Sequence, residues 1–94
     1  MTQIDAWIEG KKVLLLGFGR EGQSTYRMLA RTKRYASLTI ADQNTEKAWL
    51  PDPDVSWIVG PDYQKTLDEY DVVFKSPGIV LEHPGTEYRC SIIS

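Results

Sequence analysis

The stretch KVLLLGFGREGQST, residues 12–25, decides the fold class of this chain. Its residues 13–16, VLLL, are an unbroken apolar run, which is typical of a strand buried on both faces of a parallel sheet. Its second half spaces Gly17, Gly19 and Gly22 as GxGxxG and continues into a polar segment. A buried strand that leads through such a turn into a helix is an arrangement that binds phosphate groups. We therefore expect a strand-turn-helix unit with an anion site at the turn.

The three glycines have different expected tasks. Gly17 permits a tight turn, Gly19 lets a phosphate approach the backbone, and Gly22 lets the helix pack closely on the strand. The alternative is a tight strand-to-helix turn that holds no ligand, because the pattern alone is not decisive.

Further apolar runs follow the first at similar spacing, at residues 37–42, 55–60, 71–76 and 89–94. Apolar positions at helical spacing over 23–34 predict the first crossover helix. Shorter helical segments are expected at 45–50 and 61–70. The sequence thus predicts an α/β, Rossmann-like fold with about five mostly parallel strands and helices on both faces of the sheet.

Composition restricts the class of protein. A chain of 94 residues fits one compact domain, and 41% hydrophobic with 26% charged residues is ordinary for a soluble protein. No apolar run approaches the roughly 20 residues of a membrane span, and no secretory signal is visible at the N-terminus. The single cysteine, Cys90, fits a reducing compartment, and the net charge of -2 argues against non-specific nucleic-acid binding. We expect a cytoplasmic domain with neither a membrane nor a nucleic acid as partner.

Two polar segments follow the second and fourth expected strands. Asp42 lies about 20 residues beyond Gly22, where the dinucleotide fingerprint places an acid that accepts hydrogen bonds from ribose. The alternative for Asp42 is to cap the turn that follows it. The loop Ser76-Pro77-Gly78 leaves the same edge of a parallel sheet as the glycine turn, so both are expected to line one crevice. An ordinary strand-ending turn is the alternative for this loop.

Taken together, these segments resemble the N-terminal domain of the Mur ligase family, in particular the members that add D-glutamate in bacterial peptidoglycan synthesis. The resemblance rests on residues 12–25, on the acid of TIAD at 39–42 and on DVVFKSPGI at 71–79, and it covers nearly the whole chain. It implies a monomeric Rossmann-like domain that holds the UDP part of UDP-MurNAc-L-alanine instead of NAD. In the complete family enzyme, ATP and Mg²⁺ serve to form an acyl phosphate, which the amine of D-glutamate attacks.

The resemblance implies UDP contacts from three segments. The glycine turn meets the diphosphate and uridine side, the segment after the second strand lies near the uracil, and the loop after the fourth strand closes the pocket. The matched residues are, in that order, Gly17, Gly19, Arg20, Glu21 and Gly22; Asp42, Gln43 and Asn44; and Ser76, Pro77 and Gly78. Arg20 is a candidate partner for phosphate, and the alternative is an exposed arginine paired with Glu21 or with nothing.

The family's ATP domain opens with a Gly-Lys-Ser or Gly-Lys-Thr phosphate loop, and this motif does not occur in the 94 residues. We therefore expect residues 1–94 to be a single N-terminal UDP-substrate domain, separated from the central ATP-binding and C-terminal domains. Such a fragment binds without catalysis, so no residue is assigned a catalytic role. No metal site is expected either, because His83 is the only histidine and has few candidate partners.

Two other functions stay open. The first is an NAD- or ATP-sensing regulatory domain of a potassium channel or transporter, whose first turn and second-strand acid read similarly. The second is the NAD-binding half of a dehydrogenase, in which Asp42 would hold the adenosine ribose. The SPGI segment at 76–79 favours the ligase.

Overall fold

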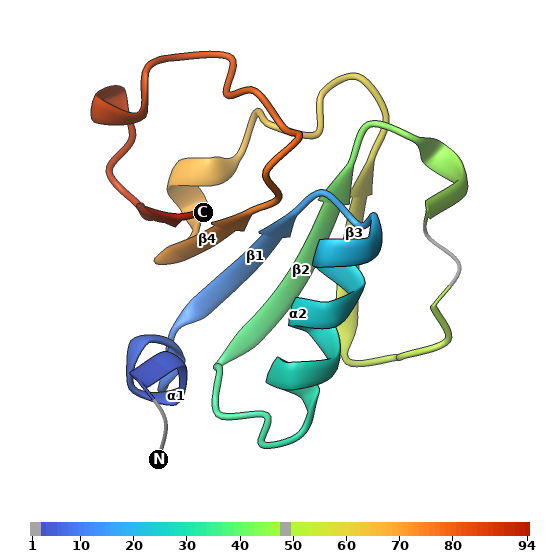
Figure 1. The fold of residues 1–94 in the computed structure, drawn as a ribbon, viewed down its shortest axis with the longest axis vertical. Helices are drawn as coiled ribbons and strands as arrows, with labels where there is room; N and C mark the ends of the chain where they lie inside the picture. Colours follow the sequence, from blue (N-terminus) through green and yellow to red (C-terminus); the bar gives the residue numbers. More distant parts are fainter. Residues whose placement is uncertain (1–2, 48–49) are drawn as a thin grey trace.

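The computed structural model describes residues 3–47 and 50–94 and is built around a five-stranded sheet with the strand order β3-β2-β1-β4-β5 (Figure 1). The strands are β1 (Lys12–Leu16), β2 (Ser37–Asp42), β3 (Val55–Val59), β4 (Val72–Lys75) and β5 (Ser91–Ile93). Every neighbouring pair is parallel. The predicted Rossmann-like α/β fold with about five strands is confirmed, and the sheet is wholly rather than mostly parallel.

Helical segments connect the strands. They are the α-helices α1 (Gln3–Ile8) and α2 (Arg20–Ala30) and the 3₁₀ helices η1 (Thr45–Lys47), η2 (Leu67–Glu69) and η3 (Gly85–Glu87). One face of the sheet carries α1 and α2. The other face is covered by the connections that contain η2 and η3, through residues such as Leu67 and Tyr88. Among the described residues, no helix is long and apolar enough to cross a membrane.

The structure corrects three expected helices. The crossover helix begins at Arg20 rather than at residue 23 and ends at Ala30 rather than at residue 34, because Gly19 is its N-cap and the glycine motif lies in its first turn. The helix expected over 61–70 is largely wrong, since only η2 is helical there. Within 45–50 only η1 is helical, and residues 48–49 lie outside the described chain. The helix α1 was not expected at all.

The strand β1 is the centre of two cores. Val13 and Leu15 belong to the cluster on the α-helical face, while Leu14 and Leu16 belong to the cluster on the opposite face. All four side chains are at most 1% exposed. The unbroken apolar run is therefore explained by burial on both faces, because alternate side chains of a strand point to opposite sides.

We expect Leu14→Ala to lower the free energy of unfolding by about 2 to 5 kcal/mol, because it leaves a cavity in a fully buried part of the second core. Val80→Ala is the matched control, since Val80 is 83% exposed and its truncation removes little packing. Urea unfolding of both variants measures the difference. Equal losses of the free energy of unfolding in the two variants would contradict the central place of β1 in the cores.

Candidate functional site

The carboxyl ends of β1, β2 and β4 bring the three predicted site segments to one edge of the sheet. The amide of Gly17 donates to the carbonyl of Ala41 at 2.7 Å, which joins the glycine turn to the end of β2. The amide of Ser76 donates to the carbonyl of Leu16 at 3.0 Å, and its Oγ donates to the carbonyl of Gly17 at 3.4 Å. The loop after β4 is thereby held against the glycine turn.

Two of the three motif glycines are required by the packing of the chain itself. Gly17 has a φ of +97°, and a Cβ at this position would lie 2.9 Å from Ser76 Oγ. A Cβ on Gly22 would overlap the carbonyl oxygen of Gly17. The expected tight turn at Gly17 and close helix packing at Gly22 are therefore confirmed.

Gly19 differs from these two glycines. No described atom lies within 4 Å of a Cβ built on Gly19, so the space beside its backbone is open. It is the N-cap of α2 and has no side chain to bond the first helical amides. The amide of Gln23 makes the first helical bond, to the carbonyl of Gly19 at 2.9 Å, and the preceding amides have no partner within the helix. The turn thus presents amides and the positive end of the helix dipole to open space.

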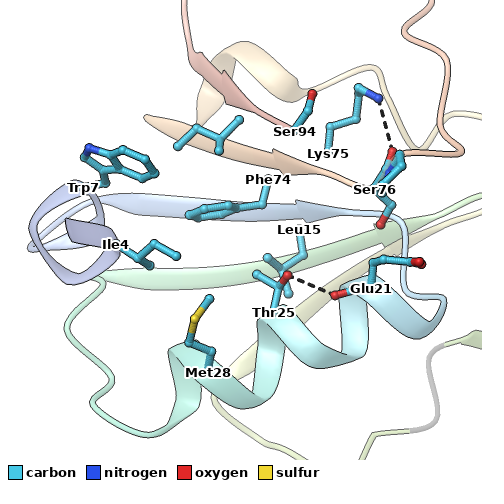
Figure 2. A pocket seen from close by; sticks show the side chains of 13 residues that line it. Ile4, Trp7, Leu15, Glu21, Thr25, Met28, Phe74, Lys75, Ser76 and Ser94 are labelled. Atoms are coloured by element: carbon cyan, nitrogen blue, oxygen red, sulfur yellow. Dashed lines mark hydrogen bonds between the residues drawn. The ribbon is translucent and has the colours of Figure 1, made fainter. Parts of the chain in front are cut away.

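The charged pair that follows Gly19 is exposed. Arg20 and Glu21 are both solvent-exposed, and none of the ion pairs among the described residues joins them. The pair with Glu21 is therefore not formed, whereas an exposed arginine without an ion pair, the other form of the alternative, agrees with the structure. Glu21, Gly22, Ser76 and Pro77 all line one groove of 290 Å³ (Figure 2).

Asp42 connects two turns through its carboxylate. Oδ2 accepts a hydrogen bond from the amide of Phe18 at 2.7 Å, and Oδ1 accepts one from the amide of Asn44 at 2.8 Å. The second bond is the turn cap that the sequence analysis gave as the alternative for Asp42. The first spans the sheet edge and fixes the glycine turn beside β2. Each oxygen thus already has one partner before any ligand is considered.

The remaining predicted residues lie at the rim of this edge. Gln43 and Asn44 are exposed, and Asn44 Oδ1 accepts a hydrogen bond from the amide of Glu46 at 3.0 Å, which begins η1. Pro77 and Gly78 are exposed as well, and a Cβ on Gly78 would have no described atom within 4 Å. The structure therefore gathers all the predicted residues at one edge, while their contacts with a ligand stay a prediction.

Phe18, which the sequence analysis passed over, anchors the turn. It stands between two motif glycines and is 1% exposed. Its ring packs edge-to-face on Trp57 at 5.3 Å and on Tyr26 at 6.2 Å between ring centroids. Its carbonyl accepts a hydrogen bond from Gln23 Nε2 at 3.3 Å. An aromatic residue inside a glycine turn is the signal that could have identified this anchor, since a large apolar side chain favours burial.

Lys75 is a second residue that the sequence gave no reason to single out. Its Nζ donates to the carbonyl of Ser76 at 3.2 Å and to that of Ile79 at 2.8 Å (Figure 2 shows the first of these). These bonds tie together the two ends of the loop that follows β4. Lys75 thus stabilises the loop conformation with its charge.

Among the described residues, no group of three or more His, Cys, Asp or Glu side chains is placed to hold a metal ion. His83 lies beside Glu87, with 3.6 Å between Nδ1 and Oε2, in the connection between β4 and β5. The turn at Gly19, where backbone amides face open space, is the part of this edge that another molecule could approach.

Known proteins similar to this chain are glutamate-adding ligases, matched over part of their length. The chain is 37% identical over 75 residues to the UDP-N-acetylmuramoyl-L-alanine--L-glutamate ligase of Xanthomonas campestris. It is 30% and 32% identical, each over 83 residues, to the UDP-N-acetylmuramoylalanine--D-glutamate ligases of Vibrio vulnificus and Leuconostoc mesenteroides. These matches cover 77%, 86% and 81% of this chain, in that order, but only 16%, 19% and 18% of the relatives. They suggest a segment of a Mur ligase.

No family model matches the chain, and no solved structure matches it.

We expect Gly22→Ala to lower the free energy of unfolding by about 1 to 3 kcal/mol, because its methyl group would displace α2 from the carbonyl of Gly17. Gly19→Ala is the matched control, with open space around the new methyl group and a cost below about 1 kcal/mol at the N-cap. Urea unfolding compares the two. A larger loss at Gly19 would contradict the division of tasks among the glycines.

We expect Asp42→Asn to speed hydrogen exchange at the Phe18 amide and to lower the free energy of unfolding by about 1 to 3 kcal/mol. The two bonds go to different carboxylate oxygens, and in asparagine one of these becomes an NH₂ group, which cannot accept from a backbone amide. Asp62→Asn, at an exposed position after β3, is the control. Unchanged exchange at Phe18 would show that Asp42 does not hold the turn.

Proposed function

We propose that this chain is the N-terminal, UDP-binding domain of a ligase that adds glutamate to UDP-MurNAc-L-alanine in peptidoglycan synthesis. The observation that carries this proposal is the open backbone of Gly19 at the start of α2, held against the Ser76 loop. Because the chain is similar to parts of such ligases, we assign the diphosphate of the UDP group to this turn.

The diphosphate would lie over Gly19 and accept hydrogen bonds from the first amides of α2. The exposed guanidinium of Arg20 would add a charge-assisted contact. The dipole of α2 favours the same anion, because its amino end faces this edge. Glu21 has the opposite charge to Arg20 and the same charge as the phosphates, so its carboxylate would lie on the side away from them.

The uracil would lie beside the turn that follows β2. Gln43 is exposed there, and its side-chain amide has both a donor and an acceptor for the ring's carbonyl and N–H groups. Asp42 would act first by holding the glycine turn, because both its oxygens bond to backbone amides. The loop Ser76-Pro77-Gly78 would close the pocket from the other side.

The names of the relatives support the shared part of their substrates as the ligand. The proteins are named for UDP-N-acetylmuramoyl-alanine in common and differ in L- or D-glutamate. A segment similar to both groups is suited to the part that they share. For the complete enzyme we propose D-glutamate as the amino acid added, and the Xanthomonas relatives make L-glutamate the second candidate.

Catalysis would belong to the rest of a longer chain. The chain spans less than a fifth of the curated relatives that it matches, at 16–19% of their lengths. ATP and Mg²⁺ would be held by those further domains, because the Gly-Lys-Ser/Thr loop does not occur in these 94 residues. The domain itself would bind as a cytoplasmic monomer, with the other domains of its chain as partners and without a catalytic residue of its own.

The deciding experiment is a two-dimensional NMR titration of the domain with UDP, NAD and ATP in parallel. We expect UDP to shift the amides of Gly19, Gly22, Asp42 and Gly78, with smaller or absent shifts for NAD. Shifts with NAD and none with UDP would overturn the ligase proposal in favour of the regulatory or dehydrogenase function.

Two arginines at opposite ends of α2 provide a matched pair for this titration. We expect Arg20→Ala to weaken UDP binding about tenfold, which corresponds to about 1.4 kcal/mol, because it removes a charge beside the phosphates. Arg31→Ala removes the same charge at the C-cap of the helix and should leave the affinity unchanged. Equal effects would place the diphosphate away from the turn.

A further inference from the structure

The face of the sheet that carries α2 is only partly covered. Leu29 of α2 packs in one cluster with residues of β1, β2 and β3, such as Leu15, Leu38 and Val55. The helix α1 packs at the amino end of β1 through Ile8. Between the two helices, over β4 and β5, lies the groove of 290 Å³ (Figure 2).

The groove has two chemically distinct ends. One end, at the carboxyl edge of the sheet, is formed by residues of the candidate site. The rest, near α1, is here called the lower part. It is apolar and is formed by Ile4 and Trp7 of α1, Met28 of α2, Phe74 of β4 and Ile93 of β5. A second hollow of 340 Å³ shares Trp7 and Ile93 with it and is otherwise lined by Val72 and by the polar residues Lys11, Asp71 and Ser91.

Two of the three exposed large hydrophobic residues of the described chain line this groove. Trp7 and Met28 are each 39% exposed, and within the described residues Val80 is the only other large hydrophobic side chain in this class. Phe74 and Ile93 are register partners on β4 and β5 and are half-buried at the base of the groove. Single exposed apolar residues are ordinary, whereas a groove that gathers several indicates an interaction surface.

The end of the described chain lies in the groove. Ser94 follows β5 and lines the groove together with Ile93 (Figure 2). A polypeptide that continues from Ser94 therefore starts inside it. Serine is also a preferred N-cap residue, so Ser94 is suited to begin a helix that runs back along the strands.

The topology of the sheet restricts which kind of secondary-structure element can cover the groove. The connections from β3 to β4 and from β4 to β5 lie on the opposite face, through Leu67 and Leu81. Right-handed crossovers require this side, and a sixth strand next to β5 would place its connection there as well. The groove would stay open in that case. A helix that ends the sheet and leads to another domain is the element that can cover it.

We infer that the residues following Ser94 in the longer chain form an amphipathic helix whose apolar side packs into this groove, against Trp7, Met28 and Phe74. The inference rests on the part of the proposed function that makes this chain one domain of a longer ligase, since the matched relatives are much longer. It does not depend on the identity of the nucleotide. The helix occupies the lower part of the groove and leaves the glycine turn open to ligand.

Met28 offers a direct measurement, because the 94 residues contain only one other methionine, Met1. The methyl signal of Met28 is recorded in the 94-residue chain and in the full-length chain, each with a soluble paramagnetic agent. We expect strong broadening in the 94-residue chain and severalfold less in the longer one. Equal broadening in both would overturn the inference, as would a natural chain that ends at Ser94.

Protection of Met28 in the 94-residue chain that grows with protein concentration would also overturn it, because the occupant would then be a second copy. A variant pair tests the groove itself. Met28→Lys in the longer chain should expose the indole of Trp7 to the agent, whereas Val80→Lys, outside the groove, should leave it protected. Trp7 protected in both variants would contradict the proposed contact.

The proposed UDP binding and the proposed helix can be overturned independently of each other. Protection of Met28 without a response to UDP would leave the helix in place and remove the nucleotide assignment. A response to UDP without protection of Met28 would do the opposite.

Discussion

The close approach of α2 to the end of β1 is the constraint on which the rest of the site depends. Gly22 lies so near the carbonyl of Gly17 that no side chain fits between them. This contact sets where α2 begins and directs its first turn along the carboxyl edge of the sheet. Because Gly17 also needs a positive φ, the turn has one compact path from strand to helix. The backbone of Gly19 is left facing open space as a result.

A turn of this kind needs support from outside, because glycines bring conformational freedom and no packing of their own. Phe18 supplies an anchor in the core, and the carboxylate of Asp42 holds its amide from the neighbouring strand. The loop after β4 closes on the turn through Ser76, and Lys75 secures that loop. The turn that we propose as an anion site is therefore held in shape by side chains that need not touch a ligand. Such preorganisation lowers the entropic cost of binding.

The two faces of the sheet are covered to different extents. The opposite face is covered by the connections that end at β4 and β5, which pack residues such as Leu67 against it. The α-helical face is closed over β1 to β3, and over β4 and β5 it keeps an apolar groove that reaches Ser94. One groove thus joins the candidate ligand edge to a surface suited to further polypeptide, which places the domain's two proposed partners side by side.

The sequence by itself determined the class of fold and which segments form the candidate site. The unbroken run at 13–16 predicted a strand with both faces buried, and the glycine spacing together with that run predicted a turn into a helix. Side-chain contacts between distant residues were decided by the tertiary structure alone. The bond of Asp42 to Phe18 spans 24 positions, and the uncovered surface near Trp7 appears only when β4 and β5 lie beside β1. Periodicity and turn chemistry report local constraints, whereas these features depend on which strands become neighbours.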